Sequence, residues 1–222
     1  MSGEHTRPAD IERTSMAIIS QELEDRGIAL PRETAAVVKR VIHTTADFDY
    51  VENLRFTPDA VAKGVQTMRG GVIVTDTNMA CAGISKPTLA RLGSEAHCFM
   101  AEPFIADAAR EQGTTRAAAA MDWALEKYPN AILAVGNAPT ALLRIVELLE
   151  EGKRPALVIG VPVGFVNVVE SKERLLEACL RYRVPAIVAM GRKGGSNVAA
   201  AICNALLYTA ADTINPADRG WQ

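Results

Sequence analysis

Cysteine and histidine are scarce in this sequence, which contains four cysteines and three histidines among 222 residues. The cysteines form no CxxC pair and no Cys/His spacing typical of a zinc site; they are Cys81, Cys98, Cys179 and Cys203. The start of the chain also lacks the basic-then-apolar pattern of a signal peptide. We therefore expect a cytoplasmic protein with reduced core thiols and no bound metal.

The motifs of several enzyme classes are missing as well. No GxSxG occurs, and neither His5 nor His97 lies next to an obvious nucleophile, so a hydrolytic triad is poorly supported. His97 is predicted to be a satisfied core histidine in a strand, and His5 to be solvated in a polar N-terminal arm. GxxxxGK[ST] is absent, and so is GxGxxG with a following ribose-binding acid.

The chain has no excess of positive charge and no long apolar run. The formal net charge is −2, so no global field attracts nucleic acid. The longest uncharged apolar run, at 155–169, is shorter than a membrane span and is broken by proline and glycine. We expect neither nucleic acid nor a membrane as a partner, and an anionic ligand must be bound by a local basic pocket.

Hydrophobic residues make up 49% of the chain and charged residues 23%, which is typical of a globular protein. Apolar periodicity predicts helices at 8–27 and 31–47. Helix-like stretches then alternate with five short apolar runs that read as buried strands, within 70–76, 96–101, 130–137, 154–162 and 184–191. This alternation predicts an α/β fold: one three-layer α/β/α domain over residues 1–222, with a mainly parallel sheet and a helical N-terminal region. Residues 1–9 and 211–222 are expected to be flexible ends.

Four predicted strand exits combine glycine with small polar residues, which lets a ligand approach the backbone closely. In open α/β sheets ligands bind at such exits. The segments are TDTNMACAG (75–83), GNAPT (136–140), GVPVGFVNVVESK (160–172) and GRKGGSN (191–197). Turn and cap requirements explain any single loop equally well, but four together favour a pocket.

The segment GRKGGSN is the strongest local signal. Its glycines allow a tight backbone path, its serine or asparagine can cap the following helix, and Arg192 and Lys193 add cationic donors. A phosphate and a carboxylate fit such a site equally well. Arg116, at the start of a predicted helix, is either part of a surface salt bridge or a bidentate clamp on a carboxylate. Ser15 is either an ordinary helix serine or a ligand hydroxyl.

His43 lies near the end of the second predicted helix, with charged residues on both sides. Lys39 and Arg40 precede it by four and three residues, so they lie on the same side of the helix. These cations disfavour the imidazolium and Asp47 favours it, which describes a proton donor or acceptor with a tunable pKa. The competing interpretation is a helix-end histidine that caps the last carbonyls.

Six segments are long or unusual in composition: TSMAIIS, RVIHTTADFDY, TDTNMACAGI, GNAPTALLRIVE, GVPVGFVNVVESKE and GRKGGSNVAAAICNALLY. In this order, over roughly residues 10–210, they resemble the precorrin-8X methylmutases of corrin (cobalamin, vitamin B12) biosynthesis. HTTADFD and GRKGGSN resemble the versions in the cobalt-containing, oxygen-independent branch, the cobalt-precorrin-8 methylmutases.

The resemblance implies an isomerase that moves a methyl group from C-11 to C-12 of (cobalt-)precorrin-8 by a 1,5-sigmatropic shift, without a cofactor, to give (cobalt-)hydrogenobyrinate or cobyrinate. It implies that His43 protonates, or hydrogen-bonds to, a ring nitrogen near the migrating methyl. It also implies a homodimer whose corrinoid site lies near the subunit interface. The residues it assigns to binding of the multiply carboxylated substrate are Ser15, Arg40, Asp76, Thr77, Arg116, Asn137, Thr140, Gly164, Arg192 and Gly195.

Two other functions stay open on the residues alone. GRKGGSN can be the anion loop of a phosphate- or nucleotide-binding α/β protein. A non-catalytic tetrapyrrole carrier would bind the same ligand without any methyl shift. Binding of ATP, NAD and a corrinoid distinguishes the first of these, and conversion of precorrin-8 distinguishes the second.

Overall fold

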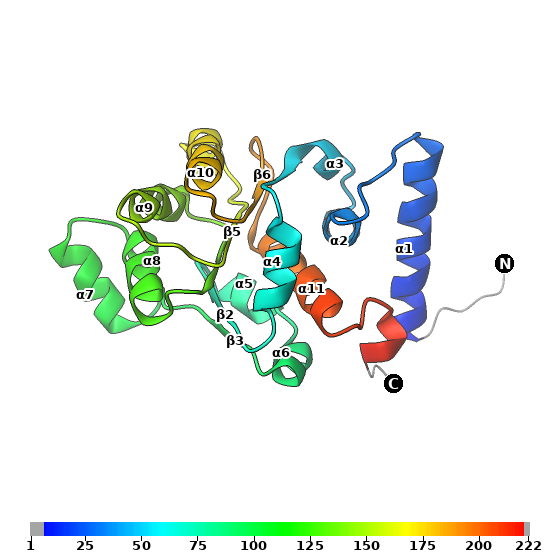
Figure 1. Ribbon diagram of the computed structural model, residues 1–222, viewed down its shortest axis with the longest axis horizontal. Helices are drawn as coiled ribbons and strands as arrows, with labels where there is room; N and C mark the ends of the chain where they lie inside the picture. Colours follow the sequence, from blue (N-terminus) through cyan, green and yellow to red (C-terminus); the bar gives the residue numbers. More distant parts are fainter. Residues whose placement is uncertain (1–6, 220–222) are drawn as a thin grey trace.

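The computed structural model describes residues 7–219, which fold into three layers: a six-stranded sheet with a layer of helices on each face (Figure 1). The strand order is β1-β6-β5-β4-β2-β3. The strands are β1 (Leu54–Phe56), β2 (Val72–Thr75), β3 (Glu95–His97), β4 (Ile132–Val135), β5 (Leu157–Gly160) and β6 (Ala186–Ala189). The predicted α/β class is confirmed, and each of the five predicted runs overlaps a strand, although β3 ends at His97 and the rest of the 96–101 run is not a strand.

The sheet is parallel except at one edge. β2 to β6 run in the same direction, with Ile73 beside Ile132 and Val158 beside Ala186. β1 pairs antiparallel with β6, and Leu54 lies opposite Ala189. β1 was not predictable from the sequence, because three residues of an edge strand give too short a pattern to distinguish from the helices around it.

The central strands are buried on both faces, and their side chains alternate between two apolar cores. On β5, Leu157 and Ile159 belong to one core and Val158 to the other. Strands buried in this way read as continuous apolar runs, which is why they were visible in the sequence.

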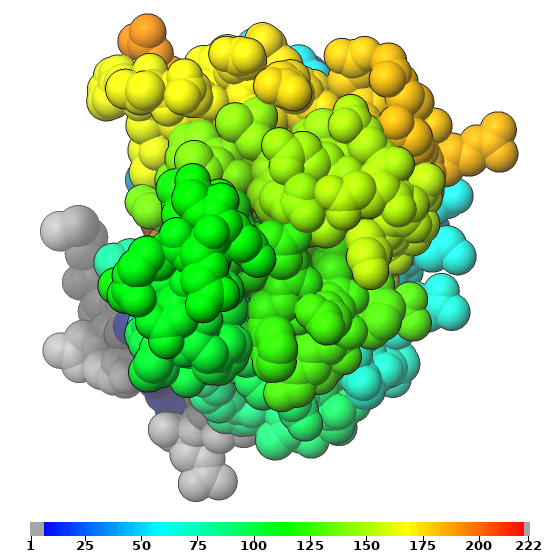
Figure 2. All heavy atoms as spheres, turned by 90° about the vertical axis from the view of Figure 1, so that its left-hand side faces the viewer, coloured from blue at the N-terminus to red at the C-terminus, as the bar shows by residue number. Residues whose placement is uncertain are grey.

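One face of the sheet is covered by α7 (Pro103–Glu111), α8 (Arg116–Lys127), α9 (Pro139–Glu150) and α10 (Val168–Tyr182). Figure 2 looks onto the outer side of this layer, whose atoms run from green to yellow. The other face carries α2 (Ala35–Thr45), α4 (Ala60–Thr67), α5 (Asn78–Gly83), α6 (Lys86–Leu92) and α11 (Ser196–Ala210). The short α3 (Tyr50–Asn53) joins α2 to β1.

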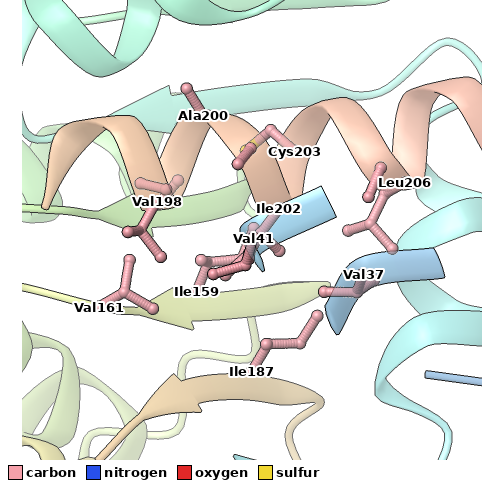
Figure 3. Packing of buried hydrophobic residues seen from close by; sticks show 14 of the residues in the cluster. Val37, Val41, Ile159, Val161, Ile187, Val198, Ala200, Ile202, Cys203 and Leu206 are labelled. Atoms are coloured by element: carbon pink, nitrogen blue, oxygen red, sulfur yellow. The ribbon is translucent and has the colours of Figure 1, made fainter. Parts of the chain in front are cut away.

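Helix α11 is the centre of the second layer. It is apolar on nearly all sides, and a helix of this kind is stable only when neighbours surround it. Figure 3 shows Val198, Ile202 and Leu206 of α11 packing with Ile159 of the sheet and Val41 of α2. This packing fixes α2, which carries His43, against the core.

Helix α1 (Pro8–Asp25) lies outside α2, into which it packs Ile19 and Leu23 (Figure 1). Near the other end of the chain, Pro216–Arg219 forms a 3₁₀ turn, and Arg219 Nη1 donates to both oxygens of Glu12 at 2.6 and 2.8 Å. The described part of the predicted flexible C-terminal end therefore contacts helix α1. The rest of the two predicted flexible ends, and His5, lie outside the described residues.

None of the helices within residues 7–219 is both long and apolar enough to cross a membrane. All four cysteines are free: Cys179 and Cys203 are buried, as predicted, whereas Cys81 and Cys98 are only half-buried. His97 lies on the edge strand β3, where Nε2 is 2.8 Å from Glu95 and the ring stacks with Phe99 and Tyr128. Its hydrogen bonding is satisfied as predicted, but it is partly exposed, because β3 has a neighbour on one side only.

Candidate functional site

Because β2, β4, β5 and β6 are parallel, the four polar loops that follow them meet at one edge of the sheet. The loops begin at Asp76, Gly136, Val161 and Met190. β1 runs the other way, so the segment that enters it lies at the same edge, and Met190 donates its amide to the Asn53 carbonyl at 2.8 Å. The chain from the end of α2 to β1 therefore lies beside these loops.

Asp76 joins the loop after β2 to the loop after β4. Its side chain is fully buried and accepts the amide N–H groups of Gly136, Asn137 and Ala138 at 2.7–2.8 Å. Burial raises the pKa of this carboxyl above its ordinary value, and the three amide donors oppose that effect. Both oxygens are occupied by backbone donors, so Asp76 shapes the loop and exposes Asn137 instead of facing a ligand itself.

Thr77 has a similar positioning role. Its hydroxyl accepts the Ala80 amide at the start of α5 and lies 2.7 Å from the Ser196 hydroxyl at the start of α11. Gly136 lies against the same point, because a Cβ there would be 2.7 Å from Ser196 Cα. The loops after β2, β4 and β6 are thus in direct contact, and Gly195 and Asn137 are brought together.

Arg116 and Thr140 lie on neighbouring helix starts. Thr115 caps α8 through the Ala118 amide, and its hydroxyl is 2.9 Å from that of Thr140 at the start of α9. Arg116 follows directly, is exposed, and makes no ion pair within residues 7–219. The surface salt bridge considered for Arg116 is therefore not formed there, and its guanidinium is available to an anion.

The loops after β5 and β6 are bonded to each other through their backbones. Gly164 donates its amide to the Arg192 carbonyl at 3.2 Å, and Gly195 donates to the Val161 carbonyl at 2.8 Å. The Arg192 guanidinium lies 5.3 Å from the Phe165 ring centroid and has no carboxylate partner in the described chain.

An apolar surface adjoins this cation. Phe165 is 82% exposed and Val166 76%, and Val163, in the same loop, is also exposed. Adjacent exposed apolar side chains mark a surface that binds a ligand or a partner. The edge of the sheet therefore combines cations with an apolar platform.

His43 and Ser15 share a separate cavity between α1 and α2, with a volume of about 390 Å³. The other lining residues are Ile18, Ile19, Glu22, Arg26, Ile42, Ala46 and Phe48. Burial lowers the pKa of His43 below its ordinary value, and the nearby charge of Arg40 lowers it further. His43 is thus predominantly neutral in the free protein near pH 7.

The charges around His43 differ from those inferred from helical spacing. Lys39 Nζ donates to the Ser20 hydroxyl at 2.8 Å, and Asp47 is paired with Lys193 Nζ at 2.6 Å. The acid that favours the imidazolium is Glu12, on α1. The prediction that Lys39 and Asp47 tune His43 was therefore wrong, because spacing along one helix does not show which neighbours other elements supply.

Glu12 is the centre of a buried charged triad. It accepts Arg40 Nη2 at 2.6 Å in addition to Arg219, and both arginines lie over the Tyr208 ring. The Arg40 side chain is only 11% exposed, so in the described chain it is bound to Glu12, with little of its surface open to a ligand. Its effect on His43 is that its positive charge lowers the pKa of the imidazole.

Lys193 connects the two regions that contain predicted site residues, the end of α2 and the loop after β6. Its Nζ binds Asp47 and Asp49, each at 2.6 Å, in the segment that follows His43. The His43 helix is thereby tied to the loop that carries Arg192 and Gly195. The cavity lined by Ser15 and His43 nevertheless does not include Arg116, Asn137 or Thr140.

Comparison with known proteins identifies the family. A family model described as precorrin-8X methylmutase matches residues 10–209. The chain belongs to the precorrin-8X methylmutase family. A cobalt-precorrin-8 methylmutase from Salmonella typhimurium is 47% identical over 208 residues, covering 91% of this chain and 95% of the relative. One from Leptospira interrogans is 40% identical over 206 residues, covering 89% and 92%.

A solved precorrin-8x methyl mutase from Thermus thermophilus superposes with a TM-score of 0.82 at 44% identity, covering 91% of this chain and 96% of that one. The resemblance seen in the sequence is thereby confirmed, as is the fold. Within this precorrin-8X methylmutase fold, no cluster of three His, Cys, Asp or Glu side chains arranged for a metal occurs among residues 7–219.

Two features of the site were missed in the sequence. Glu12 gave no signal because its partners are far along the chain. Lys172 was included in a polar loop segment, although it lies buried in α10.

Proposed function

We propose that the protein is an isomerase of cobalamin biosynthesis that moves a methyl group from C-11 to C-12 of (cobalt-)precorrin-8. The observation that carries the proposal is the match to the precorrin-8X methylmutase family over residues 10–209. The two relatives described above are cobalt-precorrin-8 methylmutases, which favours the cobalt-containing substrate.

The substrate is a large flat ring with many carboxylate arms, and the edge of the sheet suits it. Arg116 and Arg192 have no carboxylate partners within residues 7–219, so they can bind the arms. Phe165 and its exposed neighbours can pack against the ring. Asn137 and Thr140 supply neutral hydrogen-bonding groups, while Asp76 and Thr77 hold the loops in place.

A sigmatropic shift breaks one carbon–carbon bond and forms another within the same molecule, so the protein needs no nucleophile. Its contribution is to hold the ring and to place one proton donor. We assign that donor to His43, with Ser15 lining the same cavity. Burial and Arg40 keep the free imidazole neutral, and in that form it can donate a hydrogen bond. Carboxylate arms bound nearby raise its pKa, so that His43 takes up a proton from solvent and, as the imidazolium, can pass that proton to the ring nitrogen.

The cytoplasmic location and the homodimer belong to the same proposal. A dimer would allow one substrate to contact residues of two chains, which suits a site whose predicted residues lie partly in the cavity between α1 and α2 and partly at the edge of the sheet. Neither nucleic acid nor a membrane is part of the proposed function.

The test is conversion of cobalt-precorrin-8 and of metal-free precorrin-8X by the purified protein, followed by absorbance and by NMR of the migrated methyl group. We expect turnover, and faster turnover of the cobalt form. A carrier would bind both the substrate and the product and convert neither, and that result would overturn the proposed function.

A further inference from the structure

Lys172 is a buried cation in the layer behind the substrate loops. It lies on α10, is 0% exposed, and is the only fully buried lysine or arginine within residues 7–219. Its Nζ donates to the carbonyls of Gly191 and Lys193, each at 2.8 Å. It has no carboxylate partner in that part of the chain, and burial lowers its pKa to about 8.

A lysine is an unfavourable residue for a purely structural role at this position. Removing its ammonium from water is costly, and no opposite charge compensates for the loss of hydration. A methionine would fill the same space without that cost. The observed contacts indicate instead that the lysine is retained for what its two hydrogen bonds do to the loop.

The two bonds set the direction of the peptide groups on either side of Arg192. In a trans peptide the N–H points opposite to the C=O. Since the carbonyls of Gly191 and Lys193 point to Lys172, the N–H groups of Arg192 and Gly194 point away from it. Neither N–H has a protein acceptor within residues 7–219.

The loop does not hold this shape by local preference. Gly191, Gly194 and Gly195 have φ values of +71°, +157° and +134°, and glycine has many other conformations available. Gly194 is also pressed close to the Val161 carbonyl, leaving no room for a side chain. The two bonds from Lys172 and the Gly195–Val161 bond therefore select one conformation among several.

We propose that Lys172 is a positioning residue, which orients the 191–195 loop so that Arg192 and two backbone N–H groups receive a carboxylate arm of the substrate. Lys172 does not contact the substrate. The inference rests on the proposed function, because that function supplies the carboxylates, and it adds a buried residue of α10 to the binding apparatus.

The experiment compares Lys172→Met with the wild type, with Lys153→Met as the matched control. Lys153 is exposed and precedes β5 at the opposite edge of the sheet. For each protein we measure KM and kcat for cobalt-precorrin-8, the Kd of cobyrinate, and the unfolding midpoint. The carboxylate contact is made equally before and during the methyl shift, so Lys172→Met should raise KM and Kd roughly tenfold and change kcat less than about threefold. Lys153→Met should match the wild type.

A double variant separates positioning from general damage. If Lys172 acts through Arg192, the combined loss of affinity in Lys172→Met/Arg192→Ala should be clearly smaller than the product of the two single losses. Wild-type KM in Lys172→Met, or multiplicative losses in the double variant, would overturn the proposal.

Lys172→Gln covers the case in which Lys172→Met does not fold, because its amide NH₂ keeps two donors in a shorter side chain. Its nitrogen lies one bond closer to the backbone than Nζ, so it cannot reach both carbonyls as lysine does. A folded Lys172→Gln with weakened cobyrinate binding therefore supports the proposal, and wild-type binding overturns it. Unfolding of both variants also overturns it, since Lys172 would then be needed for folding. If the wild type itself fails to convert the substrate, the proposed function fails, and this is seen before any variant is compared.

Discussion

Glu12→Gln, which replaces one carboxylate oxygen by an amide NH₂ group, is expected to destabilise the folded protein strongly. The Glu12 side chain is 7% exposed and accepts three hydrogen bonds, one from Arg40 and two from Arg219. Its pKa is lowered because bonds to these two arginines outweigh the effect of burial. Removal of the charge leaves two cations facing each other in a poorly hydrated space.

Breaking a buried ion pair by removing one partner costs about 3–5 kcal/mol. For a chain of this length, each kcal/mol shifts the midpoint of thermal unfolding by about 2–4 °C, so the expected fall is roughly 6–20 °C. The assay is urea and thermal unfolding followed by circular dichroism. Asp10→Asn is the matched control, because Asp10 is an acid on the same helix whose pair with Arg13 is exposed and worth about 0–1 kcal/mol.

The pH dependence gives an independent check on the same triad. The pKa of Glu12 is lower in the folded chain than in the unfolded one, so its stabilising contribution is present above about pH 4.5 and lost as the pH falls through the folded value. Glu12→Gln should lack that part of the acid-induced loss. A loss of stability no larger than that of Asp10→Asn, with an unchanged pH profile, would refute the reasoning.

Two further predictions concern His43 and Arg116. Arg40→Met should raise the pKa of His43 in an NMR titration, because a positive charge is removed, and Glu12→Gln should lower that pKa, because a negative charge is removed. Shifts of the opposite sign would contradict the electrostatic account. Arg116→Ala should weaken cobyrinate binding roughly tenfold and leave the unfolding midpoint unchanged, whereas Arg110→Ala, an exposed arginine on α7 paired with Asp107, should change neither. If Arg116→Ala and Arg110→Ala bind cobyrinate equally well, Arg116 is not part of the binding site.

The sequence was sufficient to predict the layers of the fold because the central strands and most helices carry complete local patterns. The strands β2 to β6 are apolar runs bounded by turn residues, and α11 is apolar throughout. β1 was missed because its pattern depends on pairing with β6, which follows it by more than a hundred residues.

The candidate site was predictable to the level of loops, and less so to the level of contacts. Arg116 and Arg192 were assigned to ligand binding, and the structure leaves both without a carboxylate partner among residues 7–219. The environment of His43 was predictable only in part: Arg40, on the same helix, was expected to lower its pKa, but Glu12 on α1 and Arg219 near the end of the chain could not be foreseen. Lys172 was hidden for the same reason: its acceptors lie on another loop.

The role assigned to His43 is tested most directly by turnover of cobalt-precorrin-8 in His43→Ala, with the Kd of cobyrinate measured on the same preparation. His43 is a half-buried side chain in an open cavity, so its truncation should leave the fold intact. Loss of a positioned general acid typically lowers the rate by about 10²–10⁴-fold, and we expect kcat to fall at least ~100-fold while the Kd stays within a few-fold. Turnover within a few-fold of the wild type, at unchanged affinity, would contradict the assignment of His43 as the proton donor.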